Sequence, residues 1–267
     1  MIRLLLIALL WAGSAQAQAV RLKDLVDVEG VRGNDLIGYG IVVGLAGTGD
    51  TLQNSPYTEE ALSSLLERLG VNVLGERFRP ENVAAVIVTA TLPPFARQGS
   101  RIDVAVSSVG DSESLEGGLL VMTPLLGADN EVYAVAQGPL VVGGFDVQGQ
   151  AASARQGTPT HATISAGARV EREIDFTFGA MREVTLALRD PDFTTARRIE
   201  DLLSQRFPGV RAEMTDAGTV VLDVASAGIK PARLMADIES LVLTPARKAR
   251  VVIDQRSGTI VLGEDVR

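Results

Sequence analysis

The only histidine of this 267-residue chain, His161, is the first side chain to consider for chemistry, because imidazole serves both as a general base and as a metal ligand. It lies in a polar stretch, with no acidic residue within four positions, and the chain contains no Gly-x-Ser-x-Gly motif. A Ser-His-Asp triad assembled from residues distant in sequence stays open. Because the chain has no cysteine, a zinc site would depend on carboxylates, and we predict no metal site.

One pair of acidic residues has the spacing of a catalytic pair. Glu171 and Glu173 would share one face of an extended segment, but Arg169 and Arg172 are their neighbours. A glycosidase pair normally needs an apolar pocket that separates the two pKa values. A solvated strand or a salt-bridged interface explains these residues more simply, and we predict no catalytic residue.

A second acidic group, Asp111, Glu113 and Glu116, could bind a hard cation. Its members lack the regular spacing of a calcium-binding loop. We interpret this segment as a polar loop.

The glycine-rich run LIGYGIVVGLAGTGD, residues 36–50, invites a nucleotide-binding reading. Residues 38–43 lack the third glycine of a dinucleotide fingerprint, and residues 44–49 lack the Lys-Ser/Thr pair that would hold a phosphate and magnesium. We predict no cofactor. The glycines indicate turns and close packing, with close backbone approaches expected at Gly38, Gly40 and Gly44.

The composition limits the class of protein further. The net charge is −8 and there is no basic run, so nucleic acid and anionic lipid are poor partners. Aromatic residues make up 4% of the chain, so the core must be built from Val, Leu, Ile and Ala. Without disulfides, stability must come from packing or assembly.

The first 19 residues have the form of a cleavable secretory signal. Arg3 is followed by the apolar run Leu4–Trp11 and then by small residues with the A-x-A cleavage pattern. We predict cleavage after Ala19, with Ala17 as the alternative. The apolar run is shorter than the roughly 20 residues that span a bilayer, and no later run is long enough, so we expect no membrane span in the mature chain.

The remaining chain divides by pattern into three parts. Residues 20–148 are predicted to form a Gly-rich, mostly β domain with one amphipathic helix that opens at a Thr58 N-cap and ends at Gly70. Short connections between its strands favour antiparallel meanders. Residues 149–168 are rich in Gly, Ala, Ser, Thr and Gln, and we predict a polar linker or loop there.

Residues 169–267 are predicted to form an α/β module. Strand, helix, hairpin, helix and a second hairpin are expected over residues 183–188, 192–206, 210–224, 231–243 and 249–263. The order β-α-β-β-α-β is typical of a ferredoxin-like, or split βαβ, module. The predicted fold class is therefore α+β.

An ordered series of motifs carries a family resemblance. The motifs are Leu36–Asp50, Asn82–Asp103, Val106–Asp129, Val132–Phe145, Val170–Glu173, Leu188–Ile199 and Val251–Arg267 (VVIDQRSGTIVLGEDVR). In order and approximate spacing this set resembles the flagellar P-ring protein family over nearly the whole mature chain.

The resemblance implies a secreted, non-catalytic subunit. It would assemble into a homo-oligomeric ring around the rod of the flagellar basal body, associated with the peptidoglycan layer, and would form a bushing with the outer-membrane L ring. Members of the family usually continue beyond a GTIVLGEDVR-like segment, so we expect this chain, which stops at Arg267, to lack their C-terminal region. Some members also carry a cysteine pair that is absent here.

A closed ring needs two different complementary patches on each subunit. Pro93, Pro94, Phe95 and Arg97 are a candidate interface, because Pro-Pro keeps an aromatic residue and an arginine out of the strand ladder. A core-packed turn with Phe95 buried is the competing interpretation. Two other functions stay open, a periplasmic peptidoglycan-binding module that forms no ring and a periplasmic hydrolase with Ser or carboxylate chemistry.

Overall fold

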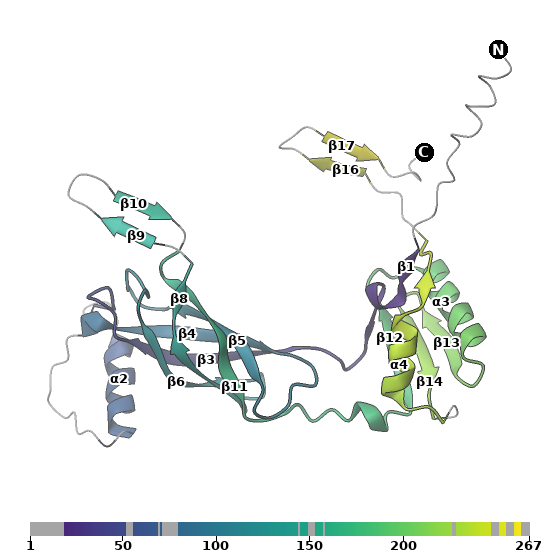
Figure 1. The fold of residues 1–267 in the computed structure, drawn as a ribbon, viewed down its shortest axis with the longest axis horizontal. Helices are drawn as coiled ribbons and strands as arrows, with labels where there is room; N and C mark the ends of the chain where they lie inside the picture. The colour runs from purple at the N-terminus through teal and green to yellow at the C-terminus, as the bar shows by residue number, and fades with distance from the viewer. Residues whose placement is uncertain are drawn as a thin grey trace, which may run out of the picture. The chain divides into compact units, whose positions relative to one another are not determined.

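The computed structural model describes residues 19–51, 56–68, 70, 80–143, 145–148, 153–156, 158–225, 228–246, 251–254 and 259–262. Two compact units are present: Arg32–Phe176, called here the barrel unit, and Met1–Val31 with Thr177–Arg267, called the two-segment unit (Figure 1). Residues 1–18 of the predicted signal, with the Ala17 cleavage position, lie outside the described residues. Among the helices of the described part, none has the length and apolar character needed to cross a membrane.

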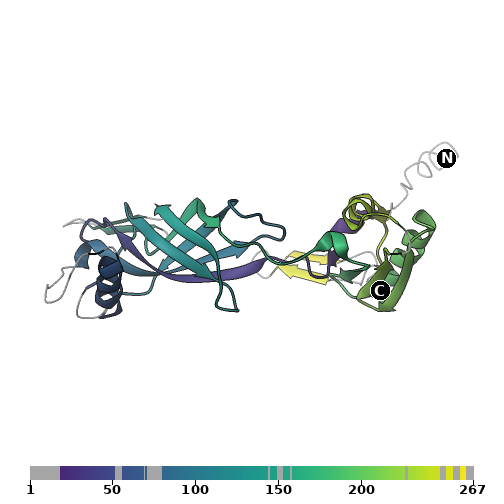
Figure 2. The same cartoon turned by 90° about the horizontal axis from the view of Figure 1, so that it is seen from below.

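The barrel unit is built on one long antiparallel sheet that closes on itself. Its strands are β3 (Asn34–Val43), β4 (Val83–Leu92), β5 (Arg101–Ser108), β6 (Leu119–Leu126), β7 (Val132–Pro139), β8 (Val141–Val142) and β11 (His161–Val170). The pairing order is β5-β4-β3-β6-β7-β11, and β11 returns to pair with β5, which closes six strands into a barrel (Figure 2). The short β8 pairs with β11.

Four further elements belong to the barrel unit. Helix α2 (Pro56–Arg68) packs on β3 and β4, and the 3-10 helix η2 (Pro80–Asn82) precedes β4. Strands β9 (Phe145–Gln148) and β10 (Ser153–Gln156) form a separate hairpin.

Alternating residues explain why these strands close around a core. In β5, Ile102, Val104 and Val106 are buried, whereas the residues between them face outward. The same period of two runs through parts of the other strands, as expected where one face is buried and the other is not, although residues 40–42 of β3 and 84–86 of β4 are all buried. The interior is a single apolar cluster of small and branched side chains, as the low aromatic content requires.

Two glycines of β3 allow β6 to approach closely. An added Cβ at Gly38 would lie 2.4 Å from the Pro124 carbonyl oxygen, and one at Gly40 would lie 2.3 Å from Thr123 Oγ1. The register between these neighbouring strands shifts between Ile37 and Val42, as at a β-bulge. The predicted close approach at Gly44 is wrong: this residue has a φ of 82° with nothing near its Cβ position, and it serves the turn.

Helix α2 begins two residues before the position predicted for its N-cap. Pro56 occupies the first turn, where its missing N–H costs nothing. Thr58 therefore lies inside the helix, and its hydroxyl donates to Asp50 Oδ2 at 2.6 Å instead of capping the helix.

The two-segment unit combines the first strands of the chain with its last part. Its elements are β1 (Val20–Arg21), η1 (Leu22–Asp24), β2 (Val26–Val28), η3 (Phe178–Ala180), β12 (Glu183–Leu188), α3 (Phe193–Arg206), β13 (Arg211–Asp216), β14 (Thr219–Asp223), α4 (Pro231–Glu239), β15 (Val242–Leu243), β16 (Val251–Asp254) and β17 (Thr259–Leu262). Asp192 caps α3 by accepting from Thr195 N at 2.7 Å.

The predicted α+β class with a ferredoxin-like module is wrong. The chain is mostly β, with a closed six-stranded barrel and a few short helices. The sheet of the two-segment unit has the order β13-β14-β12-β2, so Val26–Val28 takes the edge place that the strand after α4 would fill in a split βαβ module. That later strand, β16, instead pairs with β17 in a separate hairpin. Helix α4 also ends at Glu239, since Val242–Leu243 pairs with β1.

The segment predicted as a polar linker differs in its second half. His161–Val170 forms β11, and Ala162, Ile164 and Ala168 are buried in the barrel core. Its apolar periodicity is broken at the bulge between Ile164 and Ala168, where Ala166 has a φ of 52°. Because the bulge interrupts the alternation of buried and exposed residues, the sequence does not show the period of two typical of a strand.

We expect Gly40→Ala to lower the free energy of unfolding by about 1–3 kcal/mol, because the added methyl group overlaps Thr123. The three nearest atoms all belong to the Thr123 side chain, so Thr123→Ala should cancel part of the loss in a double-mutant cycle measured by chemical denaturation. Gly38→Ala should not be rescued in this way, because it meets the Pro124 backbone. Gly143→Ala, with open space around it, is the control. Equal losses of unfolding free energy for Gly40→Ala and Gly143→Ala would contradict the close approach of β3 and β6.

Candidate functional site

The histidine considered for chemistry lies on the outside of the barrel. His161 and Ser107 are paired positions of β11 and β5, and Ser107 Oγ lies 2.9 Å from His161 Nδ1. Both residues are exposed. Within the described part of the chain no carboxylate hydrogen-bonds to this imidazole, so the third member of a Ser-His-Asp triad is not supplied there.

Of the two glutamates considered for catalysis, only Glu173 forms a surface ion pair among the described residues, and Arg172 between them pairs with a different glutamate. Glu173 accepts from Arg97 Nη1 at 2.7 Å, and Arg172 pairs with Glu131 at 2.7 Å. Glu173 is therefore held in a surface ion pair with Arg97 rather than paired with Glu171 in an apolar pocket. No group of His, Asp or Glu able to hold a metal ion is found in the described residues.

The glycine-rich loop before α2 uses its backbone N–H groups internally. Gly47 N donates to Asn82 Oδ1, and Gly49 N donates to the Glu81 carbonyl at 2.7 Å. A phosphate-binding loop would direct such groups at its ligand. Gly49 is required here because an added Cβ would lie 2.4 Å from the Val83 carbonyl oxygen.

The loop ends at a buried carboxylate that the sequence analysis missed. Asp50 is fully buried. Its Oδ2 accepts hydrogen bonds from Thr58 Oγ1 at 2.6 Å and from Ala85 N at 2.7 Å. Its Oδ1 accepts a hydrogen bond from Ser112 N at 3.0 Å. These bonds compensate the loss of water around the anion. Asp50 thereby joins α2, β4 and the loop after β5. The sequence feature that could have pointed to this buried carboxylate is an aspartate that follows Gly-Thr-Gly and precedes a helix by a few residues.

The candidate interface Pro93–Arg97 is a turn held against the segment after β11. Ala96 N donates to the Pro93 carbonyl at 3.2 Å, and Pro93 is exposed whereas Pro94 is half-buried. Phe95 has a φ of 62°, is 51% exposed, and its ring centroid lies 6.1 Å from that of Phe176. The phenyl ring is therefore neither buried in the core nor fully in solvent.

Arg97 and its neighbours attach this turn to Glu173. The backbone N–H of Gln98 and the Arg97 guanidinium both donate to Glu173, and together they lower the pKa of that carboxyl. The Arg97 side chain is 79% exposed, so most of its surface stays available. The role of Pro93, Pro94, Phe95 and Arg97 as an interface remains a prediction.

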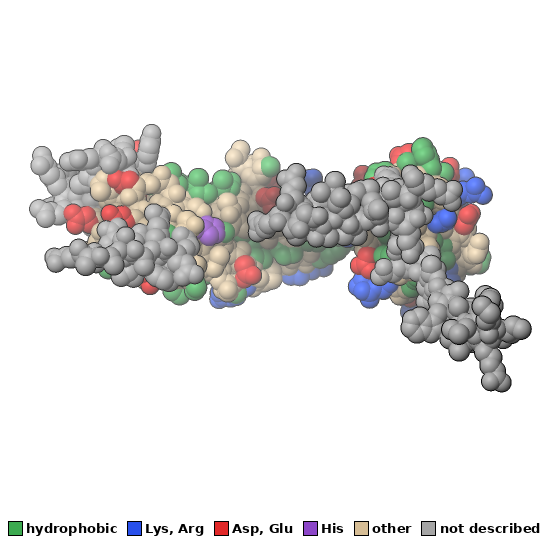
Figure 3. All heavy atoms as spheres, turned by 90° about the horizontal axis from the view of Figure 1, so that it is seen from above, with side chains coloured by type: hydrophobic (Ala, Val, Ile, Leu, Met, Phe, Trp, Pro, Cys, Tyr) green, Lys and Arg blue, Asp and Glu red, His purple; other side chains and the backbone are tan. Residues whose placement is uncertain are grey.

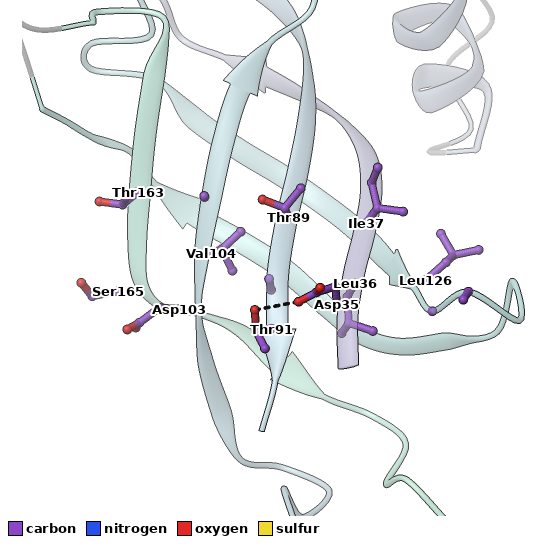
Figure 4. Close-up of a pocket in the computed structure, with 14 residues that line it drawn as sticks. Asp35, Leu36, Ile37, Thr89, Thr91, Asp103, Val104, Leu126, Thr163 and Ser165 are labelled. Carbon is purple, nitrogen blue, oxygen red and sulfur yellow. Dashed lines mark hydrogen bonds between the residues drawn. The ribbon is translucent and has the colours of Figure 1, made fainter. Parts of the chain in front are cut away.

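A hollow of about 910 Å³ lies on the outer face of the barrel (Figure 4). Outward-facing residues of β3, β4, β5 and β11 line it together with the buried Leu36, Ala90 and Val104, and Leu126 lies at the end of β6. Small side chains such as Thr89, Ala105 and Thr163 leave the space open. Thr91 Oγ1 donates to Asp35 Oδ1 at 3.1 Å within it.

An apolar row borders this hollow on the α2 side. Tyr39 and Ile87 are paired positions of β3 and β4, and they are 47% and 38% exposed. Partial burial, together with the nearby charges of Asp50 and Glu60, raises the pKa of Tyr39. The outer face thus offers exposed apolar surface, the usual material of protein contacts.

We expect Asp50→Asn to cost about 1–3 kcal/mol of unfolding free energy, since the amide NH₂ must face either Ser112 N–H or Ala85 N–H and leaves that donor without an acceptor. Asp35→Asn, the same change at an exposed position with one hydroxyl contact, should change stability by less than about 0.5 kcal/mol. Thermal unfolding of both variants checks this. Equal effects would exclude a structural role for the Asp50 contacts.

Comparison with known proteins gives a consistent result. The flagellar P-ring protein family matches this chain over residues 21–267. A flagellar P-ring protein of Ruegeria pomeroyi is 61% identical over 100% of this chain and 73% of its own length. Flagellar P-ring protein 2 of Cereibacter sphaeroides is 61% identical with the same coverage, and the Rhodospirillum rubrum protein is 53% identical over 99% of this chain and 71% of its own length.

The residues matched by the family, 21–267, therefore include both units and the series of motifs from Leu36 to Arg267. The relatives extend beyond the aligned region, since the chain spans about three quarters of their length. Family membership rests on the aligned residues alone, and on that basis this chain belongs to the flagellar P-ring protein family.

Proposed function

We propose that this chain is a structural subunit of the flagellar basal-body P ring. Copies of it assemble into a ring around the rod in the periplasm, and this ring acts with the L ring as a bushing. The observation that carries the proposal is the family match over residues 21–267, with 61% identity to a named flagellar P-ring protein over the full chain.

The architecture supports a structural role. The barrel interior is a packed apolar cluster contributed by all six strands, which suits a rigid body. Closure also pairs both edges of the six-stranded sheet, so this sheet has no free edge for adding a neighbour's strand. Contacts between barrel units are then made by outward-facing side chains and loops.

Export to the periplasm is part of the proposal. The signal over residues 1–19 directs the chain across the inner membrane and is cleaved after Ala19, with Ala17 as the alternative. The intact mass of the exported protein distinguishes these two sites.

Deletion of the gene should remove P rings from isolated basal bodies viewed by electron microscopy and should abolish swimming motility. Expression of this chain in the deletion strain should restore both. Intact P rings in the deletion strain would refute the proposed function. Binding of the purified chain to peptidoglycan without any ring would instead support a cell-wall binding module.

The turn at Pro93–Arg97 is proposed as one contact of the ring. It presents a half-exposed Phe95 and a mostly exposed Arg97 on a backbone fixed by Glu173. Aromatic residues and arginines contribute much of the binding energy at protein interfaces.

Phe95→Ala with Arg97→Ala should lower the number of P rings at least tenfold while the purified variant keeps its fold, because two anchor side chains typically supply more than about 2 kcal/mol. The matched control is Phe193→Ala with Arg197→Ala in the two-segment unit, where Phe193 is 67% exposed and the Arg197 side chain 76% exposed. Normal rings with the first variant would remove this turn from the interface.

A further inference from the structure

Two arginines face each other on the outer surface of the barrel. Arg101 of β5 and Arg169 of β11 are directly paired positions, and both side chains are exposed. Like charges at opposed positions of an antiparallel pair repel each other. Such a pair is tolerated most easily where an anion compensates it.

Among the described residues, the acidic side chains around this pair form no ion pair with it. Asp103 Oδ1 accepts from Ala166 N at 2.7 Å, and Arg101 Nη1 donates only to the Ala166 carbonyl, at 3.2 Å. Glu173 and Glu131 are engaged by other arginines. Across the residues that the structure describes, neither Arg101 nor Arg169 forms an ion pair with a carboxylate, Glu171 included.

An acidic loop lies at the opposite end of the same strand. Residues 109–118 (VGDSESLEGG) contain three acidic residues and no basic residue. Glu113 and Glu116 are exposed, and in the described part of the chain neither forms an ion pair. Asp111, in contrast, accepts from the Thr51 hydroxyl and backbone N–H.

The backbone of this acidic loop is fixed. Glu113 N donates to the Thr48 carbonyl at 2.9 Å, Leu115 N donates to the Pro159 carbonyl at 2.9 Å, and Ser112 N donates to Asp50. The carboxylates of Glu113 and Glu116 are therefore presented from a rigid base. A preorganised charged group loses less entropy on pairing.

The two patches are separated along the barrel. Strand β5 runs from Arg101 to Ser108, just before the acidic loop, and at about 3.3 Å per residue it spans roughly 25 Å. In Figure 3 the visible Arg and Lys side chains of this unit lie away from the α2 end, whereas acidic side chains reach that end. The arginine pair and the acidic loop thus lie at opposite ends of β5.

We propose that neighbouring copies of this chain contact each other head to tail, with Glu113 and Glu116 of one copy pairing with Arg101 and Arg169 of the next. A heterologous contact of this kind needs two distinct complementary patches, and it closes into a ring when the rotation fits. Arginine forms bidentate bonds with carboxylates, which fixes orientation. Each exposed ion pair contributes little binding free energy. The role of this contact is therefore to set the direction and register of assembly.

This inference rests on the proposed function, and charge reversal in the deletion strain tests it. Arg101→Glu with Arg169→Glu should reduce P rings per basal body at least tenfold, and so should Glu113→Arg with Glu116→Arg. The four changes combined should restore rings. The control is Arg182→Glu with Arg233→Glu, the same charge change at exposed positions of the two-segment unit. Thermal unfolding of each purified variant verifies its fold.

Cysteine crosslinking gives an independent test, because the chain contains no cysteine. Glu113→Cys with Arg169→Cys in one chain should yield a ladder of multimers on oxidation of basal bodies, whereas each single variant should yield no ladder. Normal rings with either charge reversal, equal loss in the control, or rings without a ladder would overturn the head-to-tail contact. Those outcomes leave the proposed function intact, since it fails only if the unmodified chain does not restore rings.

Discussion

The close approach of the neighbouring strands β3 and β6 is the contact on which the barrel depends. Six strands close only if each passes near its neighbour along its length, and here two strands meet where Gly38 and Gly40 carry no side chain. Thr123 fills the space beside Gly40 and is itself buried, with its hydroxyl bonded to the Val121 carbonyl. Closure then lets β11 pair with β5 and encloses the apolar cluster.

A second constraint fixes the loops at the α2 end of the barrel. The buried Asp50 carboxylate accepts three hydrogen bonds, one each from α2, β4 and the loop after β5. An anion in such a place is tolerated only when its lone pairs are satisfied, so the three segments are held in one arrangement. Gly110 is part of this arrangement, since an added Cβ would lie 2.3 Å from Asp50 Oδ1. The rigid acidic loop is a direct consequence.

The sequence predicted individual elements better than their partners. The β5 alternation and the helical pattern over residues 192–206 are local signals, and the structure contains β5 and α3 there. The ferredoxin-like module was wrong because Val26–Val28, far away in sequence, occupies the sheet edge beside β12. No local periodicity specifies which of two strands pairs there.

What residue identity and order determine can be separated from what only the three-dimensional contacts decide. The composition, the signal pattern and the motif series by themselves determined the family, the apolar aliphatic core and the absence of disulfides, because these depend on residue identity and order. Only the tertiary structure decided that Arg101 faces Arg169, that Asp50 is buried, and that Phe95 lies beside Phe176. These residues are far apart in the sequence, and the closed barrel and its strand register bring them together. The local sequence pattern does not specify pairing over such distances.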